Sequence, residues 1–525
     1  MSNEIQLQKK RKTSLGDFYW AHADILRGAG VSEAGYDQRI LAFMALKLLM
    51  DNGKLKFNFE YDNQFGLSEV EYLKYKGKSS KETFANLLND LPELGQNLRY
   101  FEQEAKYNPG VYKTVLSYFN HHSVFPIDSY LNELEDHYFE MILDIYIEKA
   151  DFTNFPKEQY KDLYERTIAR MRSKFAGELV GQHFTQKSII HLMCEYALRR
   201  IKNKKHIAIY DPTCGTGSMV MESAYYFRNK LPKAKIEVFG QEMNGKVWFL
   251  SKIFLEICPW DGGIQGISNI IAFGNTLTRP AFADKINGDD SFDFIIANPP
   301  FGVDWKQDYE EIVKNMASDT PHFLVVNDGK KFITPRKSDG QFLFMMQIVR
   351  LLTAERTRGK HAIAAVISSS TLCSTGSETG SESKIRRKIF EEKVVTGLLE
   401  QPNAMFTNTD IGTHIWFFDN AQSKTIRLVR ADNSEKPLYS PHPAAQDKMR
   451  NTYSDENITE LVNILHEPEP REYVAQSIPA EGRHAINIQT EIGKREEIDT
   501  VDLDELEAQI IRELDLLIQN LKPNE

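Results

Sequence analysis

The sequence has few cysteines, and their positions match no metal-binding or disulfide pattern. Only four occur among 525 residues, at positions 194, 214, 258 and 373, with no Cys-x-x-Cys pair and no closely spaced His/Cys group. Structural zinc sites and small disulfide-bonded domains both need such clusters. We therefore expect no metal site, and a reducing, cytoplasmic location is the simplest interpretation.

Long apolar runs and an excess of basic residues are also missing. No run of about 18 apolar residues is present, which argues against a transmembrane helix. The basic residues at positions 9–12 are followed by no apolar stretch, so they do not form a secretory signal. The formal net charge of −10 is unexpected for a protein that wraps nucleic acid alone. A function on DNA would therefore require local basic patches or a basic partner.

What the sequence does contain is a change of pattern near residue 200. Residues 1–170 carry apolar residues at helical spacing and predict an N-terminal helical domain. From residue 207, short β-favouring runs alternate with amphipathic helices, which predicts an α/β fold with a mostly parallel sheet. We expect the sheet domain to span residues 171–425 and a C-terminal extension with a helical tail to span 426–525. The expected strands are residues 207–210, 236–241, 269–273, 292–297, 361–367, 394–399 and 413–418, of which the last two could form an antiparallel edge.

A glycine-containing loop follows the first expected strand and opens a helix. It runs Asp-Pro-Thr-Cys-Gly-Thr-Gly-Ser from Asp211 to Ser218. Glycines let the backbone approach a ligand closely, and a helix N-terminus offers free N–H groups. Glu242 ends the next strand, where a carboxylate can accept hydrogen bonds from ribose hydroxyls. No Lys-Ser/Thr pair follows the glycines, so the loop is not a P-loop; the plain alternative is a tight turn of any Rossmann-like protein.

A second stretch carries the chemistry. An apolar run from residue 292 leads into Asn298-Pro299-Pro300-Phe301 and stops there, because proline supplies no backbone donor and fixes φ. We expect a stiff loop at the carboxyl end of a buried strand, where open α/β sheets bind ligands. An amide, a proline carbonyl and an aromatic face suit an exocyclic amine on a flat ring. The plain alternative is a proline-rich turn that caps a buried strand.

Together the two stretches resemble the motifs of S-adenosylmethionine-dependent DNA methyltransferases that methylate amino groups. The wider resemblance is to the modification subunit of type I restriction-modification systems, and it covers roughly residues 15–420. The order of the motifs, with the glycine-containing loop before Asn-Pro-Pro-Phe, resembles that of adenine-N6 enzymes. Further matching segments are Leu26-Arg27-Gly28 with the helix at 41–49, Gly181 to Gln186, Gly274 to Leu277, Asp339 to Phe342, Lys384 to Arg387 and Phe406 to Thr413.

This resemblance implies a Rossmann-like methyltransferase sheet and assigns roles to individual residues. It implies that Asn298, Pro299, Pro300 and Phe301 act on a flipped-out adenine. Phe406 would form the other side of a base sandwich, unless it is a core phenylalanine. The implied cofactor is S-adenosyl-L-methionine, bound by Phe184, Thr185, Asp211, Thr213, Gly215, Thr216, Gly217, Ser218, Glu242 and Asn275.

Basic residues near a low-complexity segment are candidates for DNA contacts. Residues 368–383 are rich in serine and predict a flexible loop. Lys384, Arg386 and Arg387 follow it and could contact phosphates, although a solvated helix face is the more frequent role of such a cluster.

The resemblance also implies partners. No target-recognition domain is evident, so we expect double-stranded DNA to be read by a separate specificity subunit, with a second modification subunit and possibly a restriction subunit in the complex. A leucine-striped helix is expected at residues 501–521, and it would dock on the specificity subunit or pack within this chain.

Four positions depart from the family pattern, and other functions stay open. Gln186 stands where proline is usual, Ser218 and Met219 replace a glycine and an aromatic residue, and Asn275 stands where aspartate is common. The alternatives are methylation of an RNA adenine or a protein glutamine amide, and a non-catalytic scaffold. A nicotinamide dehydrogenase fits less well, because no hydride-transfer acid or base is evident near the sheet.

Overall fold

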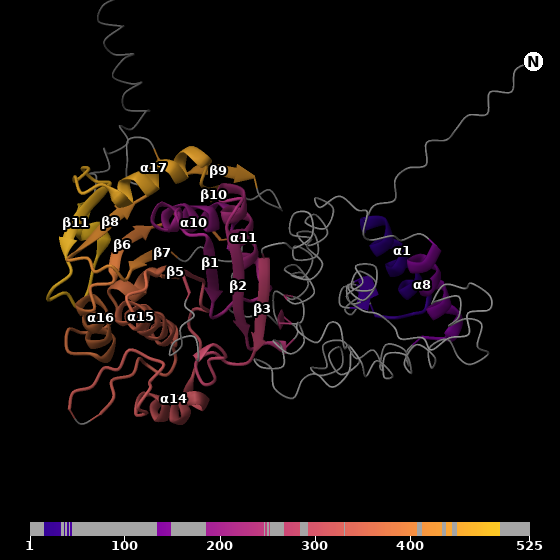
Figure 1. Ribbon diagram of the computed structural model, residues 1–525, viewed down its shortest axis with the longest axis horizontal. Coiled ribbons are helices and arrows are strands. Elements are labelled where there is room, and N and C mark those ends of the chain that lie inside the picture. The colour runs from indigo at the N-terminus through magenta and orange to yellow at the C-terminus, as the bar shows by residue number, and fades with distance from the viewer. Residues whose placement is uncertain are drawn as a thin grey trace, which may run out of the picture.

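The computed structural model describes the sheet region almost completely and the N-terminal region in part. The described residues are 15–32, 36, 39–40, 43–44, 134–148, 185–245, 247–248, 251, 267–283, 292–329, 331–406, 412–432, 437–443 and 449–493. Within them the chain forms a nine-stranded mixed sheet with helices on both faces (Figure 1). The expected α/β fold is therefore confirmed.

The strand order across the sheet is β11-β8-β6-β7-β5-β4-β1-β2-β3. Strands β3, β2, β1, β4 and β5 are mutually parallel, as the sequence predicts. β7 is antiparallel to both β5 and β6. The strands are β1 (His206–Asp211), β2 (Lys235–Glu242), β3 (Ile267–Phe273), β4 (Phe294–Ala297), β5 (Ile363–Ser369), β6 (Val395–Glu400), β7 (Thr413–Asp419), β8 (Thr425–Arg430) and β11 (Ala475–Pro479).

The antiparallel β6–β7 pair is confirmed, but its expected position at the edge of the sheet is wrong. β8 pairs with β6 in parallel, and β11 pairs with β8, so the sheet continues past residue 425. Two arginines of β8, Arg427 and Arg430, are buried, and they hide the apolar pattern that would have marked the strand. The Arg427 guanidinium donates to the carbonyls of Ile464 (2.9 Å) and Glu469 (2.6 Å). A separate antiparallel pair is formed by β9 (Ser440–Pro443) and β10 (Met449–Thr452).

The helices cover the sheet in two layers (Figure 1). Ile207 and Ile209 of β1 lie in the same apolar cluster as residues of α10 (Lys187–Ile201), α11 (Ser218–Lys230) and α17 (Asp455–His466). Ala208 and Tyr210 lie in the cluster formed by α15 (Gln341–Thr357) and α16 (Ser381–Glu391). The short helices are η3 (Lys306–Asp308), α14 (Tyr309–Met316), η4 (Ser370–Cys373) and α18 (Ile488–Ile492).

In the N-terminal region the structure describes two helices, α1 (Leu15–Gly28) and α8 (Asp136–Glu148). They contact each other, and the Tyr138 hydroxyl donates to the Gly28 carbonyl at 3.0 Å. Both are consistent with the helical pattern expected there, and the division into three domains stays a prediction. The leucine-striped helix expected at 501–521 lies outside the described residues. None of the described helices is long and apolar enough to span a membrane.

The prediction of a flexible loop at 368–383 is wrong for the first and last residues of this segment, which form regular structure. Ser368 and Ser369 belong to β5, η4 follows directly, and α16 begins at Ser381. The Arg386 side chain organises this segment. It is fully buried, and its guanidinium donates to the carbonyls of Leu372 (2.8 Å), Thr375 (2.8 Å) and His484. Arg386 therefore cannot reach a DNA phosphate in this fold, and that hypothesis is corrected: the residue ties η4 and α16 to the C-terminal segment.

Replacing Arg386 by alanine should destabilise the protein without a specific effect on DNA binding. Three backbone carbonyls, of which that of Leu372 is in a fully buried bond, lose their donor, so the free energy of unfolding should fall by about 3 kcal/mol. Arg387→Ala, on the next residue of α16, is the matched control and should cost less than about 1 kcal/mol. Chemical denaturation measures both. An Arg386→Ala protein as stable as the parent but weaker on DNA would restore the phosphate-contact hypothesis.

Candidate active site

The carboxyl ends of four parallel strands meet around one cavity of about 550 Å³. Asp211 ends β1, Glu242 ends β2, Asn275 follows β3, and Asn298 follows β4. The cavity thus combines residues from both stretches that the sequence singled out. Of the predicted site residues, its lining includes Thr185, Asp211, Thr213, Gly215, Thr216, Ser218, Glu242, Asn275, Asn298 and Pro300.

Two buried carboxylates shape the glycine-containing loop. Asp211 accepts hydrogen bonds from the Thr213 backbone N–H (2.8 Å) and hydroxyl (3.3 Å). Glu242 accepts from the backbone N–H groups of Gly215 (3.1 Å) and Asn244 (2.6 Å). Both carboxylates thereby hold backbone segments of neighbouring βα loops in place. Gly217, at φ 80°, is the N-cap of α11 in a left-handed conformation that favours glycine.

The strand behind this loop also needs a glycine. A Cβ atom at Gly240 of β2 would lie 2.8 Å from Cys214 Sγ, which is closer than van der Waals contact allows. Cys214 can therefore sit against β2 only because residue 240 has no side chain. This contact positions the loop over the end of the sheet.

Burial controls the ionisation of the two carboxylates. It raises the pKa of both Asp211 and Glu242 to about 7. Hydrogen bonds from backbone N–H groups partly oppose the shift at each residue, whereas the charge of Glu242 adds to it at Asp211. The two carboxylates therefore favour a ligand that carries hydroxyl donors or positive charge.

The far end of the cavity contains an amide–carboxylate pair that the sequence did not reveal. The Asn275 side-chain oxygen accepts from the Leu277 backbone N–H at 2.9 Å, so this oxygen is already engaged. Its amide nitrogen donates to Asp308 Oδ2 at 3.1 Å. Asp308 belongs to η3 and also lines the cavity. It lies 33 residues after Asn275, and no motif marks it.

The Asn298 side chain is oriented by a contact from another part of the chain. Its amide nitrogen donates to Thr185 Oγ1 at 3.1 Å, and the Thr185 hydroxyl in turn donates to Met219 Sδ at 3.2 Å. Because the nitrogen is committed to Thr185, the Asn298 oxygen is the atom available to accept a hydrogen bond from a ligand. Pro299 is buried and Phe301 is half-buried against the core beside this loop.

The remaining predicted residues lie at varied distances from the cavity. Gly217, Pro299 and Phe301 are next to lining residues but are not part of the lining, and Phe184 lies outside the described residues. Phe406 is only 2% exposed and belongs to the core cluster. Lys384 and Arg387 are partly exposed on α16.

The departure at Gln186 has a clear structural role. Gln186 caps α10 at its N-terminus, and its amide nitrogen donates to the carbonyls of Met405 and Asn451 (the latter at 3.1 Å). Proline could make neither bond. The segment that carries Phe406 is therefore tied to the start of α10, directly beside Thr185.

Known proteins resemble the chain in sequence and fold. The methylase subunit of the type I restriction enzyme HindI from Haemophilus influenzae is 25% identical over 310 residues, which cover 58% of this chain and 60% of that protein. The MpnII methylase subunit from Mycoplasma pneumoniae is 23% identical, with 66% of this chain and 59% of that protein covered. The match thus spans about six tenths of each relative's length.

Two solved structures share the fold. One is the methyltransferase subunit of a type I restriction-modification system from Streptococcus thermophilus, with a TM-score of 0.56, 17% identity and coverage of 89% of this chain and 96% of that chain. The other comes from work on complex assembly of a type I system, with a TM-score of 0.54, 16% identity and coverage of 98% and 99%.

The sequence profile of the N-6 DNA Methylase family matches residues 156–501. That range includes the whole nine-stranded sheet, the cavity and the Asn-Pro-Pro-Phe loop. It also extends past residue 425, in agreement with the continuation of the sheet through β8 and β11. Because the match covers well over half of the 525 residues, the chain belongs to the N-6 DNA Methylase family.

Proposed function

We propose that this chain is the modification subunit of a type I restriction-modification system. It transfers a methyl group from S-adenosyl-L-methionine to the N6 amine of a flipped-out adenine in double-stranded DNA. The observation that carries the proposal is the Asn298 side chain, held by Thr185 at the cavity that Asp211, Glu242 and Asn275 also line. Family membership and the names of the relatives support the same chemistry.

The cavity residues fit the proposed cofactor. Thr216 Oγ1 is buried in the lining and has no hydrogen-bond partner among the described residues, as expected for an atom that awaits a ligand. Glu242 can accept from ribose hydroxyls, and Asp211 lies where a cationic group is favoured. When bound, S-adenosyl-L-methionine supplies an electrophilic methyl group. The other proposed contacts are Phe184, Thr185, Thr213, Gly215, Gly217, Ser218 and Asn275.

Asn275 and Asp308 would divide the recognition of the cofactor's adenine ring. The Asn275 oxygen is engaged by Leu277, so it is not available to accept from the exocyclic amine of the ring. The Asp308 carboxylate lines the same cavity and is bonded to Asn275 through one oxygen. We therefore assign to Asp308 the acceptor role that an aspartate at position 275 would otherwise take.

The Asn-Pro-Pro-Phe loop would act on the target base. The lone pair of an adenine amine is delocalised into the ring, so the amine is a weak nucleophile. Hydrogen bonds from the amine to the Asn298 oxygen and the Pro299 carbonyl would localise that lone pair on nitrogen. Phe301 would hold the flipped ring by stacking. Phe406 lies in the core cluster, so in this fold it fits the alternative role of a core phenylalanine. Catalysis would come from positioning and fixed dipoles, without a covalent intermediate on the protein.

The same proposal includes partners. A specificity subunit would choose the DNA sequence, and a second modification subunit and a restriction subunit would complete the assembly. Because the chain has a net charge of −10, the long-range attraction of DNA would come mainly from the partner. Lys384 and Arg387 remain proposed phosphate contacts on α16.

Asn298→Ala should abolish methyl transfer while cofactor binding persists. Loss of a positioned hydrogen-bond acceptor should reduce transfer at least about 100-fold. Binding of S-adenosyl-L-methionine, measured by calorimetry, should change by less than about threefold, because Asp211 and Glu242 are untouched. Asn315→Ala on α14, outside the cavity lining, is the matched control. Full transfer by the Asn298→Ala variant would refute the assignment.

Asp308→Asn should weaken binding of S-adenosylhomocysteine by roughly tenfold, the value of one hydrogen bond to a charged group. The wild-type protein should bind S-adenosylhomocysteine more tightly than the analogue that carries a 6-oxo group in place of the amine, and Asp308→Asn should remove this preference. Asp304→Asn is the control, because Asp304 lines the same cavity but its carboxylate pairs with Lys306 at 2.6 Å. Equal effects of the two substitutions would contradict the role of Asp308.

Cofactor binding should depend on pH near neutrality. Because burial raises the pKa of Asp211 and Glu242 to about 7, both carboxylates become protonated as the pH falls below that value. The affinity for the cationic cofactor should therefore be constant above about pH 8 and fall by up to tenfold per pH unit below 7 for each carboxylate that must ionise. Glu242→Gln should make this slope shallower. Calorimetry between pH 5.5 and 8.5 tests this, and a flat profile would show that neither carboxylate titrates on binding.

A further inference from the structure

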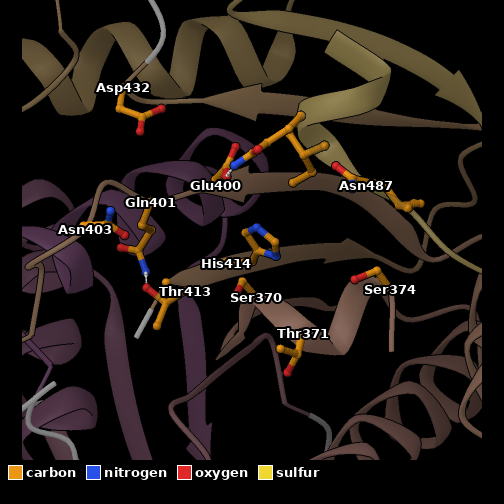
Figure 2. Close-up of a pocket in the computed structure, with 14 residues that line it drawn as sticks. Ser370, Thr371, Ser374, Glu400, Gln401, Asn403, Thr413, His414, Asp432 and Asn487 are labelled. Atoms are coloured by element: carbon orange, nitrogen blue, oxygen red, sulfur yellow. Dashed lines mark hydrogen bonds between the residues drawn. The ribbon is translucent and has the colours of Figure 1, made fainter. Parts of the chain in front are cut away.

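A second cavity, of about 380 Å³, lies at the same edge of the sheet (Figure 2). Its walls come from η4 after β5, from the residues that follow β6, from the start of β7 and from the beginning of α18. It shares no lining residue with the cofactor cavity. None of the functions assigned above uses it.

One buried atom in this cavity lacks a partner. Gln401 is only 3% exposed, and its amide nitrogen donates to Thr413 Oγ1 at 2.9 Å (Figure 2). The Gln401 backbone N–H also donates to the Thr413 carbonyl, at 3.0 Å, so the residue is fixed in place. The side-chain oxygen Oε1 is buried and accepts no hydrogen bond within the described part of the chain. Buried acceptors are almost always satisfied, so this oxygen points to a ligand that carries an N–H or O–H donor.

The charges around the cavity exclude an ionic ligand. Glu400 is neutralised by Arg430, whose Nε donates to it at 2.8 Å, and its other oxygen accepts from Gln489 at 2.9 Å. Asp432 lies at the exposed rim, 3.7 Å from Arg430. No lysine or arginine is among the described residues that line the cavity, so nothing there would pair with a phosphate or carboxylate. Both oxygens of Glu400 are engaged, and Asp432, the other carboxylate among the described lining residues, lies beside Arg430, so a cation is not favoured either.

The other walls suit a flat, uncharged ring. His414 is 6% exposed, and its Nδ1 atom lies 3.2 Å from Cys373 Sγ, which holds the imidazole plane in the cavity wall. Burial lowers the pKa of His414 to about 4, so the ring is neutral at physiological pH. Ile486 and Ile488 add apolar surface, and the amides of asparagine residues lie nearby (Figure 2). Apolar and ring faces with amide groups at the edge are the elements that proteins use to hold an unpaired base.

We propose that this cavity binds an uncharged nucleobase, with a base N–H donating to Gln401 Oε1 and the ring lying against His414 and Ile488. Gln401 and Thr413 both line the cavity, and Phe406 lies between them in the sequence. The base comes either from a second nucleotide extruded from bound DNA or from a free nucleoside. This inference does not depend on which cofactor or amine the Asn298 site uses.

The test is a titration of the full-length protein, its cofactor cavity saturated with S-adenosylhomocysteine, with adenosine, cytidine, guanosine and thymidine, followed by saturation-transfer NMR. Wild-type protein should bind at least one of them. Gln401→Met, which keeps the side-chain volume and removes the acceptor, should weaken that binding roughly tenfold, the effect of one lost hydrogen bond. Ser374→Trp, at an exposed lining position, should close the cavity and abolish binding even if Gln401→Met does not fold. Gln476→Met on β11 is the control and should leave binding unchanged.

Adding duplex DNA distinguishes the two sources. If the duplex displaces the nucleoside from wild-type protein, the ligand is an extruded base. If the nucleoside stays bound, the cavity takes a free nucleoside. Both results support the proposal. It is overturned if no nucleoside binds to the wild type, or if binding is the same in Gln401→Met and Ser374→Trp as in the wild type.

Discussion

The parallel register of β1, β2 and β4 is the constraint on which the site depends. Asp211 pairs with Gly240, and Tyr210 pairs with Ile295, so the three strands end at the same edge. Asp293 fixes the entry of β4: its carboxylate accepts from the Ala208 N–H at 2.7 Å and also binds Lys204. The polar residue at the end of each strand therefore lies at the same cavity. A shift in register would move the Asn-Pro-Pro-Phe loop away from the carboxylates of Asp211 and Glu242.

Much of this arrangement could be predicted from the sequence, because the central parallel strands are nearly continuous apolar runs. β4 is buried along its whole length, and the two prolines that follow it stop the strand where the ligand site begins. The glycine-containing loop and Glu242 were predictable for the same reason, since each directly follows a recognisable strand. Local pattern and tertiary structure agree at these positions.

The rest depends on contacts between distant residues. Arg427 and Arg386 are charged and yet buried, satisfied by backbone carbonyls that only the folded chain brings near them. Their charge indicated that these side chains lie on the surface. The sequence pattern therefore misses strand β8 and predicts a flexible loop for the segment before α16. Asp308 is recognisable only from its bond to Asn275, and the Gln401 cavity only from the pairing of β6 with β7. Sequence patterns carry the least information about buried polar groups, and in this protein such groups lie at both cavities.

The central claim is that the Asn298 loop presents an adenine amine to a methyl donor, at a DNA site chosen by another chain. The direct measurement is transfer of labelled methyl from S-adenosyl-L-methionine to duplex DNA, with and without a co-expressed specificity subunit, followed by nucleoside analysis. The account predicts label in N6-methyladenine, and only when the specificity subunit is present. Label in N4-methylcytosine, or none in DNA under either condition, would contradict it.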